Sequence, residues 1–298
     1  MAERFSTGTF GRQIACRTAD RGLRTPSGSA TEHSAADTGI GDEGLQYDTS
    51  PPLRSGRQPG AGGEDPVWGV DVRDVDRIVV ITGATGKLGP TVAATFAAAG
   101  DRIAALGRRA DALETLVEGL PGGSGRHLAL AVDLRDADRA VAASAVVRER
   151  MGPPTVLLHV VGSYRGEAGI AEAPLAEWAA MLDVNLWSTV HAVRAFLPDI
   201  RAAEHGRLVT VSTPFAASPN ATGGAYSASK AAVEALTLSV AKELAGTSAT
   251  ANVILVRTIG DAKPHHTRPA EIAAALLWLT SPDAGIVNGQ RIPLVGRG

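Results

Sequence analysis

The sequence predicts a single α/β domain with a doubly wound parallel sheet over residues 76–298, preceded by an N-terminal tail. Two observations predict this fold class. Short apolar runs alternate with longer helical stretches, which is typical of parallel strands whose two faces are both covered by helices. The first apolar run also leads directly into a glycine-rich turn, at the edge where sheets of this class bind their ligands.

The tail and the domain differ in composition. Residues 1–66 are dominated by Gly, Ser, Thr, Pro, Arg and Asp and have no sustained apolar period. Such a segment buries too little apolar surface to offset the entropy that ordering would cost. We therefore expect residues 1–75 to form a disordered tail.

The whole chain has the composition of a globular protein, with 44% hydrophobic and 20% charged residues. Its formal net charge of −2 predicts no nucleic-acid or membrane partner. The most apolar run, residues 273–279, is far shorter than the roughly 20 residues of a membrane span. Cys16 is the only cysteine, which is consistent with a reducing compartment, so we expect a cytoplasmic protein.

The first half of the domain begins with an apolar run that ends in glycines, residues 77–82, as a buried strand does. An Ala-rich helix over 88–99 follows and stops at Gly100. The same alternation predicts strands at 102–106, near 127–132 and at 155–161, with helices near 110–118 and 136–150.

The second half continues with a long helical stretch over 174–197. It is followed by strands at 207–211, 251–256 and near 290–295, with helices near 224–245 and at 270–280. Because the carboxyl ends of parallel strands meet at one edge, the ligand site is expected just after residues 82, 106, 132, 161, 211 and 256.

Three glycines, Gly83, Gly86 and Gly89, stand between the first strand and the first helix. They allow a tight turn and a close approach of the backbone to a pyrophosphate. The helix N-terminus adds free N–H groups and a positive dipole end. A strand-to-helix turn alone would use the same glycines, so the loop predicts a dinucleotide only in this context.

The second strand ends in Gly107-Arg108-Arg109, with no acid to hold the ribose 2′-hydroxyl of NAD. Two guanidinium groups suit the 2′-phosphate of NADP, although a solvated helix start would also tolerate them. The sequence therefore predicts NADP(H) as the preferred cofactor, with NAD(H) possible.

Tyr226 and Lys230 lie four residues apart, on one face of a predicted helix. At about 6 Å and an effective dielectric of 20, a Lys cation would favour phenolate by roughly 3 kcal/mol, or about two pKa units. Such a tyrosine can exchange a proton near neutral pH. The spacing alone is common on helix surfaces and gains weight from the glycine loop and the arginines.

Over residues 76–298 the sequence resembles the short-chain dehydrogenase/reductase family, and that resemblance implies a Rossmann-type fold. The motifs that carry it are residues 82–89, Asp133 in Val-Asp-Leu, Asn185 in Asp-Val-Asn-Leu, residues 206–212, Tyr226-Ser-Ala-Ser-Lys230 and Asn288-Gly289.

The resemblance implies roles for individual residues. Tyr226 would be the acid/base, and Lys230 would bind the nicotinamide ribose and lower the pKa of Tyr226. Asn185 would hold a water in the proton relay. A hydroxyl thirteen residues before the tyrosine polarises the carbonyl in the family; that register favours Thr213 over its neighbour Ser212.

Asp133 would hold the adenine amino group. The full set of implied cofactor contacts is Gly83, Thr85, Gly86, Lys87, Leu88, Gly89, Arg108, Arg109, Asp133, Leu134, Gly162, Tyr226, Lys230 and Ile259.

The sequence also departs from the family pattern. Lys87 stands where the glycine loop usually has Gly, and residues 159–162 keep only Gly162 of the usual Asn-Asn-Ala-Gly. His159 sits within a predicted buried strand, which favours a core histidine over a catalytic one. Residues 256–261 lack the usual Pro-Gly. His265 and His266 have no accompanying ligand set, so no metal is expected.

These features predict an NADP(H)-dependent oxidoreductase acting on a small-molecule carbonyl or secondary alcohol. The alternative is a non-catalytic dinucleotide-binding or sensor protein that has kept the fold. By the resemblance, a homodimer or homotetramer is expected. Only nine residues, 261–269, with two prolines, precede the helix at 270–280, so we expect no helical lid and an open substrate site.

Overall fold

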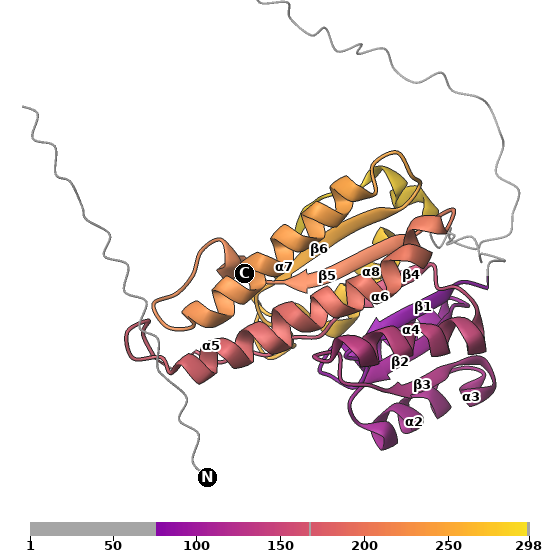
Figure 1. Ribbon diagram of the computed structural model, residues 1–298, viewed down its shortest axis with the longest axis horizontal. Coiled ribbons are helices and arrows are strands. Elements are labelled where there is room, and N and C mark those ends of the chain that lie inside the picture. Colours follow the sequence, from indigo (N-terminus) through magenta and orange to yellow (C-terminus); the bar gives the residue numbers. More distant parts are fainter. Residues whose placement is uncertain (1–75, 167, 297–298) are drawn as a thin grey trace, which may run out of the picture. The chain divides into compact units, whose positions relative to one another are not determined.

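The computed structural model describes residues 76–166 and 168–296, so the expected disordered tail over residues 1–75 lies outside the described residues. Within them, seven parallel strands form one sheet in the order β3-β2-β1-β4-β5-β6-β7 (Figure 1). The strands are β1 Ile78–Thr82, β2 Arg102–Gly107, β3 Leu128–Ala131, β4 Val156–His159, β5 Arg207–Ser212, β6 Thr250–Val256 and β7 Arg291–Leu294.

Helices cover both faces of the sheet. They are α1 Gly89–Ala98, α2 Ala110–Glu118, α3 Gly123–Arg126, α4 Ala137–Met151, α5 Leu175–Met181, α6 Ser188–Ala202, α7 Gly224–Glu243 and α8 Pro269–Leu279. A π-helical segment, η1 Leu182–Trp187, joins α5 to α6, and the short 3-10 turns are η2 Pro214–Ala216 and η3 Pro282–Ile286. This arrangement confirms the doubly wound α/β class.

Alternate residues of β1 supply two separate cores. Ile78 and Val80 pack with α4, α6 and α7, whereas Val79 and Ile81 pack with α1, α2 and α8. All five residues of the strand are buried. An unbroken apolar run rather than an alternating one is what a strand with two covered faces requires.

The strand order reverses at β1, which has β2 on one side and β4 on the other. Thr82 is in register with Leu106 of β2 and His159 of β4. The connections that leave β1 and β4 therefore diverge, and the carboxyl edge of the sheet opens into a crevice between them.

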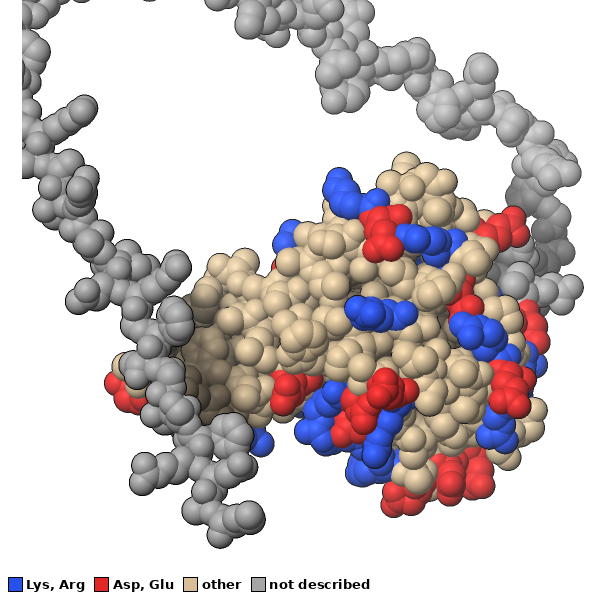
Figure 2. All heavy atoms as spheres, in the orientation of Figure 1, with Lys and Arg blue, Asp and Glu red and all other residues tan. Residues whose placement is uncertain are grey.

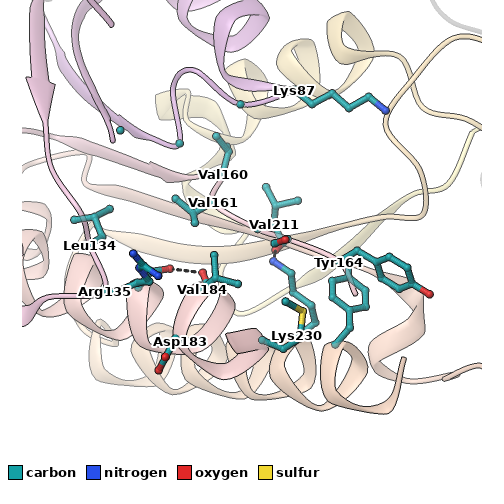
Figure 3. Close-up of a pocket in the computed structure, with 18 of the residues that line it drawn as sticks. Lys87, Leu134, Arg135, Val160, Val161, Tyr164, Asp183, Val184, Val211 and Lys230 are labelled. Carbon is teal, nitrogen blue, oxygen red and sulfur yellow. Dashed lines mark hydrogen bonds between the residues drawn. The ribbon is translucent and has the colours of Figure 1, made fainter. Parts of the chain in front are cut away.

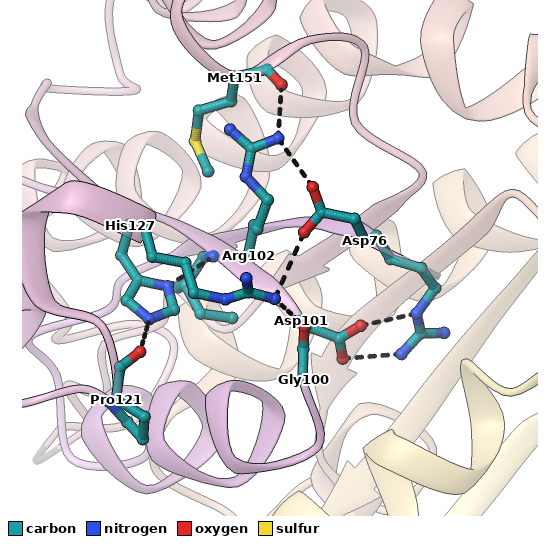
Figure 4. Close-up of polar contacts among 10 residues, drawn as sticks. Asp76, Gly100, Asp101, Arg102, Pro121, His127 and Met151 are labelled. Carbon is teal, nitrogen blue, oxygen red and sulfur yellow. Dashed lines mark hydrogen bonds and ion pairs between the residues drawn. The ribbon is translucent and has the colours of Figure 1, made fainter. Parts of the chain in front are cut away.

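A polar network lies near the amino end of β2 (Figure 4). Arg77 and Asp101 form a buried two-pronged ion pair at 2.8 Å, and Arg77 Nη1 also donates to the carbonyl of Thr280. His127 Nδ1 accepts from the N–H of Ile103, and burial lowers the pKa of this imidazole. These contacts tie β1, β2 and the end of α8 together, far along the strands from the crevice.

Two sequence expectations need correction. The single helix expected over 174–197 is divided by the π-helical segment Leu182–Trp187, and the strand expected over 155–161 ends at His159. The expectation of no lid is met, because residues 261–268 form turns without a helix. Among the described residues, no helix is long and apolar enough to cross a membrane. On the face in Figure 2, basic and acidic side chains are interspersed.

Candidate active site

A cavity of about 1070 Å³ opens at the carboxyl edge of the sheet (Figure 3). Residues at the carboxyl ends of β1, β2, β3, β4, β5 and β6 line it, together with residues of α5, η1 and α7. Most residues singled out from the sequence lie on its wall: Gly83, Thr85, Gly86, Lys87, Leu88, Arg108, Arg109, Asp133, Leu134, Gly162, Ser212, Tyr226, Lys230 and Ile259. Gly89, Asn185 and Thr213 lie behind that wall.

At two positions of the loop after β1, the backbone geometry calls for glycine. Gly83 has a φ of +73°, in the left-handed region that favours glycine. A Cβ on Gly89 would lie 2.3 Å from the carbonyl oxygen of Ala84, so only glycine lets α1 pack this closely on the loop. The loop is thus built for a tight turn into a helix N-terminus, the geometry that binds pyrophosphate.

The two arginines after β2 differ in what they contact. Arg109 Nη2 donates to the carbonyl of Thr85 at 2.8 Å and so braces the glycine loop. Arg108 lies on the cavity wall and helps to lower the pKa of Asp133. Arg108 is therefore the better placed of the two for a phosphate ligand.

Asp133 has a partner that the sequence did not reveal. Arg135 donates to its carboxylate through three hydrogen bonds of 2.5–3.1 Å. These bonds are the main cause of a pKa of about 2 for Asp133. The carboxylate is therefore ionised and fixed at the cavity wall. In the sequence, only the presence of an arginine two residues later hinted at this pair.

The hydroxyl of Thr213 faces the phenol of Tyr226 and lowers its pKa. Burial has the larger effect and raises that pKa. The expected lowering by Lys230 is therefore wrong for this structure. Lys230 Nζ instead donates to the carbonyl of Val211 at 2.9 Å, and burial lowers its own pKa to about 8.

The hydroxyl of Ser212 is engaged by α7. It donates at 2.7 Å to Oε1 of Glu234, a buried acid on α7. Oε2 of Glu234 accepts from Arg291 Nε on β7 at 2.6 Å. The geometry thus separates the two neighbouring hydroxyls and favours Thr213, the residue that the register favours.

Asn185 lies in the π-helical segment and uses its whole amide within the protein. Its Oδ1 accepts from the N–H of Ser163, and its Nδ2 donates to the carbonyl of Ser163 and to Ser229 Oγ. The side chain therefore ties the loop after β4 to α7. The water-holding role implied by the resemblance stays a prediction.

A Cβ on Gly162 would lie 3.0 Å from Nζ of Lys230, so glycine lets this ammonium come close to the loop after β4. Tyr164, which the sequence did not single out, lies against Tyr226. Its ring meets that of Tyr226 edge to face with centroids 5.0 Å apart, and its hydroxyl donates to the carbonyl of Gly166.

His159 is a core residue, as expected. Its Nδ1 lies 2.8 Å from Thr82 Oγ1 and its Nε2 lies 3.5 Å from Ser188 Oγ. Burial lowers the pKa of this imidazole to about 3. His265 and His266 meet edge to face, and no group of three or more metal-ligating side chains occurs among residues 76–166 and 168–296.

The sheet, the glycine loop and the cavity that Tyr226 lines together have the layout of a Rossmann-type α/β enzyme. The short chain dehydrogenase family matches residues 77–262, and the chain belongs to this family. It is accordingly an NAD(P)-dependent short-chain dehydrogenase/reductase.

Relatives in this family are similar over different lengths. D-threitol dehydrogenase of Mycolicibacterium smegmatis is 29% identical over 245 residues, which are 76% of this chain and 94% of that protein. A short chain dehydrogenase of Pseudocercospora fijiensis is 32% identical over 172 residues, 57% of this chain, and the match spans only 56% of that protein's length.

Solved structures have the same fold. The apo structure of a short chain oxidoreductase from Pseudomonas aeruginosa PAO1 has a TM-score of 0.69 and 25% identity, covering 74% of this chain and 96% of that one. Its NADPH-bound structure has a TM-score of 0.67 and 25% identity over 73% of this chain and 94% of that one.

Proposed function

We propose that the protein is an NADP(H)-dependent oxidoreductase that moves a hydride between the nicotinamide and a carbonyl or secondary alcohol carbon. The observation that carries this proposal is the half-buried Tyr226 on the wall of the cavity, beside the buried Thr213 and in the same cavity as the glycine loop. A protein that only binds or senses a dinucleotide has no need for an acid there.

The residues present fit the cofactor. The turn at Gly83 and the close packing at Gly89 leave backbone N–H groups free for a pyrophosphate. Arg108 offers a planar guanidinium to a 2′-phosphate. The NADPH-bound relative from Pseudomonas aeruginosa supports this choice. When bound, the cofactor supplies or accepts the hydride.

The chain's own residues supply the proton and hold the oxygen. Because burial raises the pKa of Tyr226, its phenol is neutral at pH 7 and can donate. In the reduction, the carbonyl carbon gains a hydride and the oxygen gains the Tyr226 proton, which gives a secondary alcohol. The hydroxyl of Thr213 stabilises the developing negative charge on that oxygen, and the Lys230 ammonium would donate to the hydroxyls of the nicotinamide ribose.

Two features extend the proposal. The absence of a helix in residues 261–268 supports an open substrate site. A homodimer or homotetramer is supported by the area over α7 and the adjoining part of α6, where Figure 2 shows few charged side chains, and by Trp187, which is 48% exposed.

The decisive experiment measures NADPH oxidation with a panel of ketones, aldehydes and quinones. Tyr226→Phe should lower kcat by about 10²–10⁴-fold, the usual contribution of general acid catalysis, and leave the Kd for NADPH nearly unchanged. Thr213→Val should lower kcat as well, whereas Ser212→Ala should affect it far less because Ser212 faces Glu234. Full activity in Tyr226→Phe would rule out the proposed proton donor.

A further inference from the structure

The cavity wall carries an excess of positive charge that the cofactor alone does not explain. The acids on this wall are Asp133 and Asp183, and the charges of both raise the pKa of Arg135. Beyond the arginines after β2, the wall also presents Arg165 and Arg257. Among the described residues, neither of these two is within ion-pair distance of a carboxylate.

Arg257 is the cation best placed for a substrate. It directly follows β6, and its guanidinium lies over the ring of Phe215, 5.9 Å from the ring centroid. The backbone N–H of Phe215 donates to Thr213 Oγ1, and Thr213 faces Tyr226. A single residue, Phe215, therefore contacts both the guanidinium and one of the two hydroxyls that would hold the reacting oxygen.

The cofactor's phosphates have other partners. The pyrophosphate fits the loop after β1, and a 2′-phosphate fits Arg108 after β2, at the opposite side of the switch point. Arg257 directly follows β6 and contacts Phe215, which bonds to Thr213. Its charge is thus directed to the part of the cavity where the carbonyl compound would react.

We propose that the substrate is an oxo acid, a carbonyl compound with a carboxylate a few atoms from the reacting carbon, and that Arg257 binds this carboxylate. The inference rests on the proposed function, since it assumes that Tyr226 and Thr213 hold the carbonyl oxygen. A guanidinium offers parallel N–H groups that match a carboxylate, and its cation–π contact with the ring of Phe215 helps to position it. Arg165 on the opposite loop adds to the positive potential.

The test compares methyl ketones that carry a terminal carboxylate, with one to three methylene groups between the carbonyl and the acid, against their uncharged primary amides. The wild-type protein should prefer one of the acids over its amide in kcat/KM. Arg257→Ala should lower that acid-to-amide ratio by about 10- to 100-fold, the range expected for a charged hydrogen-bonded pair, and Arg257→Lys should restore part of it. Arg150→Ala, which removes an exposed charge on α4 outside the cavity, should leave the ratio unchanged.

Two further measurements separate the possible failures. The Kd for NADPH should change by less than about 3-fold in Arg257→Ala, because the proposal assigns the phosphates elsewhere; a loss of NADPH affinity equal to the loss of acid preference would overturn it. Binding of the oxo acid to the protein with NADP⁺ is measured by calorimetry. Binding that depends on Arg257 without any turnover would support the carboxylate site at Arg257 and refute the proposed function. Equal use of acid and amide, or an unchanged ratio in Arg257→Ala, would refute the inference alone.

Discussion

At the scale of single residues, the proposed preference for NADP(H) depends on Arg108. Its guanidinium lines the cavity, whereas Arg109 braces the glycine loop through Thr85. Arg108→Asp should weaken NADP⁺ binding and strengthen NAD⁺ binding, because it removes a phosphate donor and offers an acceptor to the ribose hydroxyl. Charged hydrogen bonds are worth about 10- to 100-fold in affinity, and the ratio of the two Kd values should shift by at least that much.

Arg109→Ala is the matched control for this change. It removes the bond to Thr85 and should weaken both cofactors together, since the loop serves the pyrophosphate that they share. Titrations of both cofactors against each variant separate the two effects. Tighter binding of NAD⁺ than of NADP⁺ by the wild-type protein would contradict the assignment of Arg108.

A second prediction at this scale concerns His159 and acid stability. Burial lowers its folded-state pKa to about 3, so folding favours the neutral ring. The unfolded chain takes up a proton near pH 6.5, and the stability from this group is present above that pH and lost as the pH falls. From pH 7 to pH 5 the loss is about 2 kcal/mol by linkage.

The measurement is urea unfolding of the wild-type protein and His159→Asn at pH 7 and pH 5. The asparagine does not titrate, so the stability difference between the two proteins should shrink by about 2 kcal/mol at the lower pH. A difference that stays constant with pH would show that His159 does not titrate in this way.

Helix α7 links the site to the far strand of the sheet. Glu234 lies one turn after Lys230, raises the pKa of that ammonium, and bonds to Ser212 and Arg291. Glu234→Gln should therefore lower the pKa of Lys230 from about 8. Because the charged form of Lys230 is the active one in the proposed function, the alkaline fall in kcat should begin at a lower pH.

A change that is only structural would not move that pH limb. Arg291→Gln is the control, because it removes the other ionic partner of Glu234 and leaves the carboxylate beside Lys230. Its alkaline limb should stay in place or move to higher pH. Identical pH–rate profiles for Glu234→Gln and the wild-type protein would exclude Glu234 as a positioning residue.

The elements also show what the sequence can and cannot predict. The unbroken apolar run at 78–82 and the glycines after it predict the buried β1 and the switch point. The π-helical segment at Leu182–Trp187 is not predictable, because its residues suit an α-helix equally well. The same holds for Ser212: its neighbours in sequence do not reveal that it faces Glu234, which depends on how α7 packs on β5. The contact between Arg257 and Phe215 is a tertiary one, so the sequence shows Arg257 only as part of residues 256–261, which depart from the family pattern.

On the scale of the whole molecule, the connection between β6 and α8 determines how open the site is. Thr267 pairs with Ile259 in an isolated bridge and donates to the carbonyl of Leu294 on β7 at 2.6 Å. The connection is thereby held to the edge of the sheet, and no helix within it covers the cavity. Lids exclude water and position substrates, so among uncharged carbonyl compounds a small ketone should be held weakly.

We therefore expect the KM of small uncharged ketones to lie at or above about 1 mM, the upper end of the usual range. Bulky or flat carbonyl compounds supply their own contact area and should have a higher kcat/KM. The measurement is a series of uncharged ketones and quinones of increasing size, assayed with saturating NADPH at fixed protein concentration. A sharp maximum of kcat/KM at a small ketone, with a KM in the low micromolar range, would show that the cavity is closed in solution, either by this connection or by a partner subunit. The same series at several protein concentrations distinguishes these two, since closure by a partner would be lost on dilution.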